Sequence, residues 1–301
     1  MISPELSLPI LIPLIPTPLT QQQGSDTLLK AMKYTIITSA SNLKVREVLE
    51  VRNKRSRQRH NNAFLIEGPH LLEMAANADC IIRHVFFSES FIKKRDGQRL
   101  LKRLFEAGAD IFMAKEHVMS KLAETETPQG ILAVASYAPI DLNALTLRGK
   151  PLIVVTEGVQ DPGNLGTIIR TSDAAGADAV VILPGTCDPF MPKSLRATAG
   201  SIFNLPVIFS EADDLIGWLR KKGISLFVTD IGADKSIFNS DLHGPLALAF
   251  GNEAQGVSQR LRDTADMLIR IPIIGRAESL NVAASAAICL YETVRQRTRP
   301  F

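Results

Sequence analysis

Short apolar runs recur along the C-terminal half of the chain and alternate with stretches of helical spacing. The runs fall at 151–155, 179–183, 226–229, 246–250 and 268–271. Helices are expected at about 164–176, 192–200, 211–222 and 279–297. Buried strands that alternate with helices predict an α/β domain, in which helices cover both faces of a parallel sheet.

The preceding residues predict a second, smaller α/β domain at 33–137. Asn42 is placed to cap a helix, and Gly68-Pro69 separates a strand from the next helix. Strands are expected at 63–67, 85–87, 111–113 and 131–134, and further helices at 70–77 and 90–107. A linker at 138–150 would join this domain to the one at 151–301.

Residues 1–32 contain an apolar stretch that prolines interrupt every few positions. Proline is not tolerated repeatedly inside a helix, so this stretch predicts neither a membrane span nor a signal-peptide core. We expect a disordered extension. No other run approaches the roughly 20 apolar residues that a membrane helix needs, so no membrane partner is expected.

The composition is that of a soluble globular protein, with 46% hydrophobic and 22% charged residues and a net charge of only +3. Residues 1–137 carry 18 Lys and Arg against 14 Asp and Glu, so the basic surplus lies in the first half. Much of it forms one run: Arg52, Lys54, Arg55, Arg57 and Arg59. Such a run is expected either to follow an RNA phosphate backbone or to be the solvated end of a helix.

The cysteines and histidines exclude several kinds of chemistry. Cys80, Cys187 and Cys289 are far apart and form no CxxC pair, which indicates a reducing, cytoplasmic compartment without disulfides or a zinc site. Only one histidine, His243, falls in the C-terminal half. Neither histidine-based catalysis nor a bound metal is therefore expected.

Three polar segments stand next to the predicted strands and helices of the C-terminal half: Asn164–Arg170, Phe250–Gly256 and Ser279–Ala283. Strand ends and helix N-termini expose free backbone N–H groups, which is why ligand sites form there in α/β proteins. Each segment also has an ordinary structural interpretation. Asn164 and Ser279 are acceptable helix caps, Arg170 could form a surface salt bridge, and Glu253 could be a first-turn helix charge favoured by the macrodipole. A GxGxxG fingerprint is missing, which disfavours a nicotinamide-dependent enzyme.

Taken in order, these segments resemble the motifs of the SpoU (TrmH-like) family of RNA 2′-O-ribose methyltransferases, part of the SPOUT superfamily. Residues 151–301 are similar to the family's catalytic domain, and residues 36–135 resemble its smaller RNA-binding domain, which is related to ribosomal proteins. The matching motif residues are Asn164 and Arg170, then Gly251, Asn252 and Glu253, then Ser279, Leu280 and Asn281.

The resemblance implies a fold and a cofactor that residue patterns alone do not show. It implies a deep trefoil knot in the C-terminal domain, S-adenosylmethionine as the cofactor, and a homodimer in which the subunit interface completes the active site. The residues expected to hold the cofactor are Thr229, Gly232, Phe250, Gly251, Asn252, Ile271, Pro272, Ser279 and Leu280.

The resemblance also implies a catalytic set: Arg170, Asn164, Glu253, Ser279 and Asn281. Arginine normally stays protonated, so Arg170 as the base is a difficult assignment, and an electrostatic role on a phosphate and the developing alkoxide is the conservative one. Glu253 would orient Arg170 or Asn164.

The expected function is methylation of a ribose 2′-hydroxyl in RNA, with large-subunit ribosomal RNA as the preferred substrate. Two alternatives remain at this point. One is a tRNA 2′-O-methyltransferase, and the other is a non-catalytic RNA-binding or ribosome-assembly factor.

Overall fold

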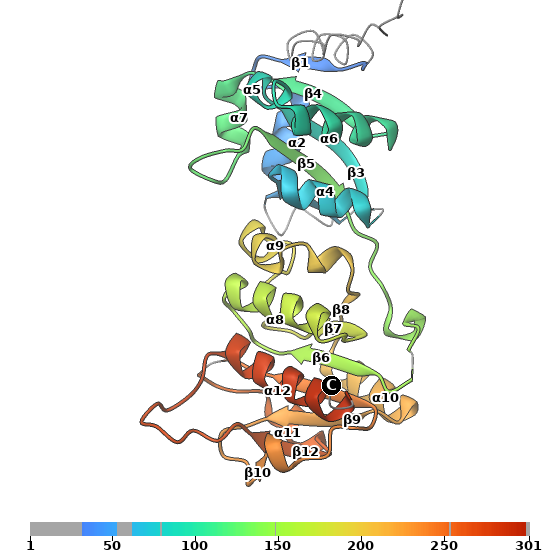
Figure 1. The fold of residues 1–301 in the computed structure, drawn as a ribbon, viewed down its shortest axis with the longest axis vertical. Helices are drawn as coiled ribbons and strands as arrows, with labels where there is room; N and C mark the ends of the chain where they lie inside the picture. Colours follow the sequence, from blue (N-terminus) through green and yellow to red (C-terminus); the bar gives the residue numbers. More distant parts are fainter. Residues whose placement is uncertain (1–31, 53–61, 79, 148, 253, 299–301) are drawn as a thin grey trace, which may run out of the picture.

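The computed structural model describes residues 32–52, 62–78, 80–147, 149–252 and 254–298. They form two sheets, within 35–136 and 152–270, which follow one another along the long axis of the molecule (Figure 1). The predicted extension lies outside these residues except for Met32, whose side chain is only 4% exposed and packs into the hydrophobic core. None of the described helices has both the length and the apolar composition needed to span a bilayer.

The first sheet has five strands in the order β1-β4-β3-β5-β2. The three parallel strands are β1 (Thr35–Ile37), β4 (Asp110–Ala114) and β3 (Ile81–Phe87). The antiparallel partners are β5 (Ile131–Ser136), which pairs with β3, and β2 (Ala63–Glu67), which pairs with β5.

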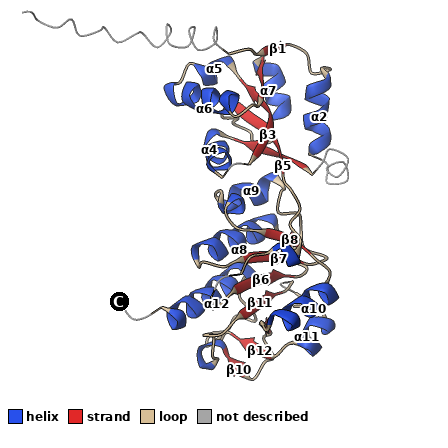
Figure 2. Ribbon diagram, turned by 90° about the vertical axis from the view of Figure 1, so that its right-hand side faces the viewer, coloured by secondary structure: helices blue, strands red, loops and turns tan. Residues whose placement is uncertain are grey.

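Helices cover both faces of this first sheet (Figure 2). One face carries α2 (Leu43–Val51) and α7 (Glu116–Leu122), and the other carries α4 (Pro69–Asn77), α5 (Glu89–Ile92) and α6 (Arg95–Glu106). The prediction of one helix over 90–107 was wrong. Lys94 adopts an extended conformation between α5 and α6, which lets Phe91 of one helix and Leu101 of the other both reach the core.

The second sheet has seven strands in the order β10-β12-β9-β11-β6-β7-β8, and all neighbouring strands are parallel. This confirms the predicted α/β class. Its strands are β6 (Leu152–Thr156), β7 (Ala179–Ile182), β8 (Val207–Phe209), β9 (Ser225–Thr229), β10 (Lys235–Ser236), β11 (Leu246–Phe250) and β12 (Met267–Arg270).

The apolar strand β6 is buried on both sides because helices cover both faces of the sheet. Leu152 and Val154 pack with α8 (Pro162–Ala174) and α12 (Val282–Arg297). Ile153 and Val155 point the other way and pack with α10 (Ala212–Lys222) and α11 (Gln259–Thr264). Helix α9 (Pro192–Thr198) lies between α8 and the first sheet (Figure 1).

An aromatic cluster joins the two sheets. Phe64 of β2 and Tyr137, which follows β5, both contact Phe190 in the loop before α9. The rings of Tyr137 and Phe190 are stacked, with centroids 4.1 Å apart and planes inclined by 11°. Phe203 stacks against the other side of the cluster, 6.4 Å from Phe64. The two halves therefore share one apolar interface.

The end of α12 is fixed by one side chain, Arg297. Its guanidinium donates to the carbonyl oxygens of Leu242 at 2.9 Å and Lys150 at 2.8 Å, and also to those of Pro151 and Gly244. These carbonyls belong to the residues before β6 and to the loop before β11. Arg297 thus ties the last helix to two segments that are distant in the sequence.

Replacing Arg297 with methionine should lower the free energy of unfolding by about 2–4 kcal/mol, because hydrogen bonds from a charged donor to several carbonyls are lost together. Methionine keeps the apolar stem. Arg220→Met is the matched control, since Arg220 is an exposed arginine in the last turn of α10, and it should cost less than about 1 kcal/mol. Urea unfolding of both variants checks the difference, and equal midpoints would contradict it.

Candidate active site

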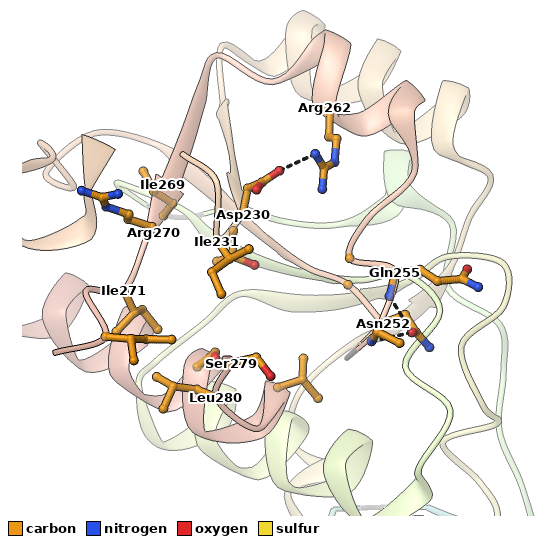
Figure 3. A pocket seen from close by; sticks show the side chains of 17 residues that line it. Asp230, Ile231, Asn252, Gln255, Arg262, Ile269, Arg270, Ile271, Ser279 and Leu280 are labelled. Carbon is orange, nitrogen blue, oxygen red and sulfur yellow. Dashed lines mark hydrogen bonds and ion pairs between the residues drawn. The ribbon is translucent and has the colours of Figure 1, made fainter. Parts of the chain in front are cut away.

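A cavity of about 220 Å³ lies where β9, β11 and β12 end and α12 begins (Figure 3). These are the carboxyl ends of parallel strands, the usual place of a ligand site in such sheets. Six of the residues predicted to hold the cofactor line it: Thr229, Gly251, Asn252, Ile271, Ser279 and Leu280.

Three other predicted residues flank this cavity without lining it. Phe250 is fully buried in the core, and the backbone N–H of Gly232 donates to Asp230 Oδ1 at 2.8 Å. Pro272 is exposed in the loop that leads to α12. Asp230 and Ile231 also line it, between the predicted residues Thr229 and Gly232, and so do Ala254, Gln255, Gly256 and Val282, which lie inside the polar segments of the sequence. Sequence reasoning missed these lining residues: Arg262, Ile269, Arg270, Ile273 and Ser285.

Asn252 organises the loop that follows β11. Its Oδ1 accepts hydrogen bonds from the backbone N–H groups of Ala254 and Gln255 at 2.9 and 3.0 Å, and its Nδ2 donates to the Gly158 carbonyl at 3.0 Å. Its backbone exchanges two hydrogen bonds with Gly256, both 2.9 Å long. The polar side chain therefore shapes this wall of the cavity.

The backbone of the neighbouring loop leaves no room for a side chain at Gly251. A Cβ atom at this position would lie 2.2 Å from the carbonyl carbon of Gly256 and 2.4 Å from the backbone nitrogen of Val257. The resemblance to the family implied that Gly251 holds the cofactor. The structure shows that the loop's own backbone already occupies the space beside Gly251.

An ion pair that the sequence did not reveal forms another wall (Figure 3). Asp230, just after β9, lies 2.7 Å from the Arg262 guanidinium of α11, measured from Oδ2 to Nη1. The Asp230 side chain is only 6% exposed. The pair links the loop after β9 to α11 and neutralises a carboxylate that would otherwise be buried with its charge uncompensated.

Asn164 and Asn281, which are 117 residues apart, are joined by a hydrogen bond of 3.0 Å from Asn281 Nδ2 to Asn164 Oδ1. Asn281 also caps α12, because its Oδ1 accepts from the N–H groups of Ala283 and Ala284. The first and third motifs therefore meet in space. They do so at the N-terminal ends of α8 and α12.

The capping residues differ from the expected ones. Asp161 caps α8 by accepting from the Asn164 N–H at 2.9 Å, so Asn164 lies in the first turn and is not the cap. The predicted start of the last helix at Ser279 was also wrong, since α12 begins at Val282 after Asn281. Ser279 instead points toward the cavity (Figure 3).

Arg170 is exposed, lies in the second half of α8 before its last turn, and does not line the cavity. Among the described residues it forms no ion pair. Glu253, which was expected to orient it, lies outside the described residues. Whether Arg170 and Glu253 act together therefore stays a prediction.

Of the predicted RNA-binding run, only Arg52 is among the described residues; Lys54, Arg55, Arg57 and Arg59 lie outside them. The Arg52 guanidinium donates to the Leu122 carbonyl and lies 3.7 Å from the Glu124 carboxylate. Arg52 is thus already engaged at the end of α7, and a phosphate contact would have to compete with these partners. No group of three or more His, Cys, Asp or Glu within the described part of the chain is placed to hold a metal ion.

Comparison with known proteins identifies the family. Residues 151–291 match the SpoU rRNA Methylase family, and residues 42–133 match the MRM3-like substrate binding domain. The chain is 37% identical to the 23S rRNA (guanosine(2553)-2′-O)-methyltransferase RlmP of Bacillus subtilis, over 85% of this chain and 97% of that protein. It is 31% identical to a 23S rRNA (uridine(2479)-2′-O)-methyltransferase of Streptomyces viridochromogenes, over 82% of this chain and 86% of that protein. The protein belongs to the SpoU rRNA methylase family, as its motifs predicted.

Solved structures agree with this placement. An AdoMet-bound rRNA methyltransferase from Sinorhizobium meliloti superposes with a TM-score of 0.81 at 29% identity, covering 88% of this chain and 99% of that one. The SpoU methyltransferase AviRb from Streptomyces viridochromogenes, in complex with AdoMet, gives a TM-score of 0.79 at 29% identity, covering 85% and 98%. The arrangement of the two sheets is therefore shared with proteins that bind this methyl donor.

Proposed function

We propose that the protein transfers a methyl group from S-adenosylmethionine to a ribose 2′-hydroxyl of 23S ribosomal RNA, in the cytoplasm. The relatives at 31–37% identity carry this activity in their names. The observation that carries the proposal is the hydrogen bond between Asn164 and Asn281, because it brings the first and third motifs together beside a cavity that the second motif lines.

The cavity has the composition that suits an adenosine-containing cofactor. Apolar side chains flank it, and two of them, Ile231 at 63% and Leu280 at 36%, are exposed on its walls (Figure 3). The polar groups come from Thr229, Ser279, Ser285 and the loop after β11, and the charged ones from Asp230, Arg262 and Arg270. A ligand site of this kind combines apolar contact area with a small number of fixed hydrogen bonds.

The proposed chemistry asks the protein mainly for alignment and electrostatic help. S-adenosylmethionine supplies an activated methyl group, and a 2′-hydroxyl is a poor nucleophile that must lose its proton. Arg170 would hold a neighbouring RNA phosphate and stabilise the developing alkoxide. Asn164, Ser279 and Asn281 would position the ribose and the cofactor, and Glu253 would orient Arg170.

We also propose that the protein acts as a homodimer. Arg170 is exposed and does not line the cavity of its own chain, which supports a partner subunit that completes the active site. The trefoil knot, the boundaries 33–137, 138–150 and 151–301, and the RNA-binding role of the 52–59 run also remain predictions.

The reaction is tested by incubating the purified protein and labelled S-adenosylmethionine with unmodified 23S rRNA transcripts and, separately, with tRNA transcripts. We expect label on one 2′-hydroxyl of 23S rRNA. Label on a base or on protein alone would refute the reaction, and label on tRNA alone would refute the substrate. A protein with no affinity for S-adenosylmethionine by calorimetry would instead be the non-catalytic RNA-binding factor.

A substitution at Asn281 separates its two contacts. Asn281→Ser should keep the cap of α12 but is too short to reach Asn164, so stability should change by less than about 0.5 kcal/mol while turnover falls about tenfold or more. Asn281→Ala should lose the cap as well, at a cost of about 1 kcal/mol. Unfolding and turnover measured on both variants check this, and normal turnover in Asn281→Ser would show that the Asn164 contact is dispensable.

A further inference from the structure

A second cavity, of about 620 Å³, lies in the N-terminal half, away from the three motifs. It is bounded by the start of α4, by the segment from the end of α5 to the first half of α6, and by the loop before β5. It falls within the range typical of small-molecule sites. None of the residues discussed above for methyl transfer lines it.

The floor of this cavity is apolar and its rim is polar. Phe91 is 3% exposed and Leu100 7% exposed, and Gly97 lies buried between them. The rim carries the exposed side chains of His70, Glu73, Lys94 and Gln129. Among the described residues, none of these four takes part in a hydrogen bond or an ion pair. Free polar groups around an apolar floor suit a ring with hydrogen-bonding edges.

The surface beside the rim carries an excess of positive charge. Residues 93–103 contain six basic side chains and one acidic one, Asp96. Lys93 is paired with Glu89 at 3.1 Å and Arg99 with Asp96 at 2.6 Å. Lys94 and Arg95 are exposed, and neither forms an ion pair among the described residues. Unpaired cations next to a cavity complement an anionic backbone.

We propose that this cavity receives one unpaired nucleotide of the RNA substrate. Its base enters the cavity, with Phe91 and Leu100 among the residues that line it, while Gln129, His70 and Glu73 contact the base edges. The adjoining phosphates lie along Lys94 and Arg95. Unpaired bases of RNA loops are recognised in this way, through a stacked or apolar face together with hydrogen bonds to the edges. This inference rests on the proposed function and adds where a second part of the RNA is recognised.

The placement of the cavity supports a single RNA that contacts both halves. Its rim includes Pro128 and Gln129 of the loop between α7 and β5. In Figure 1 this loop projects to the same side of the molecule as the loop between β12 and α12, which borders the candidate active site. The aromatic cluster of Phe64, Tyr137 and Phe190 joins the two halves. The cavity therefore acts as a recognition point at a set position relative to the site of methylation.

The test uses the full chain and an unmodified 23S rRNA transcript, with both RNA affinity and methylation measured. Lys94→Ala and Gln129→Ala should each raise the KM for RNA about tenfold. They should leave the kcat at saturating RNA and the affinity for S-adenosylmethionine unchanged. Only Lys94→Ala should also reduce the salt slope of RNA binding, by about 0.7–0.9. Lys221→Ala, an exposed lysine in the last turn of α10, is the matched control and should change none of these quantities.

Normal RNA affinity in a Lys94→Ala, Gln129→Ala double variant would overturn the proposal. An equally large loss of RNA affinity in Lys221→Ala would overturn it as well. A photo-crosslinking amino acid in place of Gln129 gives an independent readout. Crosslinks to an unpaired nucleotide support the proposal, and crosslinks to base-paired RNA or none at all refute it. If the wild-type protein binds this RNA but makes no 2′-O-methyl nucleotide, the proposed function fails while the affinity measurements still test the cavity.

Discussion

Arg170→Ala is expected to lower turnover by about 100-fold or more, with the affinity for S-adenosylmethionine nearly unchanged. The separation of the two effects follows from the position of Arg170, which is exposed on α8 and does not line the cavity of its own chain. Its removal deprives the cofactor of no contact within the subunit. A group that acts on charge developing in the transition state lowers turnover when it is removed.

Single-turnover kinetics at saturating cofactor and RNA, together with calorimetry, measure the two quantities. Arg170→Lys should retain part of the activity if the charge alone matters, and little of it if the planar guanidinium holds a phosphate through two hydrogen bonds. Arg220→Ala on α10 serves as the control for the loss of an exposed arginine. Near-normal turnover of Arg170→Ala in a folded protein would remove Arg170 from the proposed mechanism.

Gly251→Ala should reduce the affinity for S-adenosylmethionine about 100-fold or more and also lower the free energy of unfolding by about 1–3 kcal/mol. The added methyl group would meet backbone atoms of Gly256 and Val257 at 2.2–2.4 Å, and backbone cannot move aside as a flexible side chain can. The paired hydrogen bonds between Asn252 and Gly256 resist any shift of this loop. Relief of the overlap therefore has to distort one wall of the cavity.

Gly217→Ala is the matched control, because Gly217 lies in α10 and an added Cβ would meet no atom within 4 Å. That variant should be neutral or slightly stabilising, as expected for alanine in place of glycine in a helix. Calorimetry and urea unfolding of both variants compare the effects. Unchanged cofactor binding in Gly251→Ala would show that the loop tolerates the displacement.

Five strands of the C-terminal half, β6, β7, β9, β11 and β12, were predictable because each is a continuous apolar run. The run at 151–155 indicated a strand covered on both faces, and β6 is such a strand. The sequence did not show which residues of this strand face which helices. Leu152 and Ile153 have the same chemical character and yet pack into different cores. The short edge strands β1, β8 and β10 were missed, because two or three residues carry too little periodicity.

The candidate site was predictable where the three motifs or the loops beside the strands supplied its residues. Asn164, Asn252 and Asn281 belong to these motifs. The Asp230–Arg262 pair was not predictable, because 32 residues separate the two and neither belongs to a motif. The choice of Asn281 over Ser279 as the helix cap depends on the path of the preceding loop, since both side chains can accept the required hydrogen bonds.

The aromatic contacts between the halves bear on how this protein can be re-engineered. Phe64 and Tyr137 come from one sheet, while Phe190 and Phe203 flank α9 in the other half. A chimera that exchanges the first 137 residues for those of another family member would bring in foreign side chains opposite Phe190. Such an exchange should give a soluble hybrid only if the donor supplies aromatic rings of similar size at both positions. The first sheet and the surface of α9 that it contacts should therefore be exchanged together.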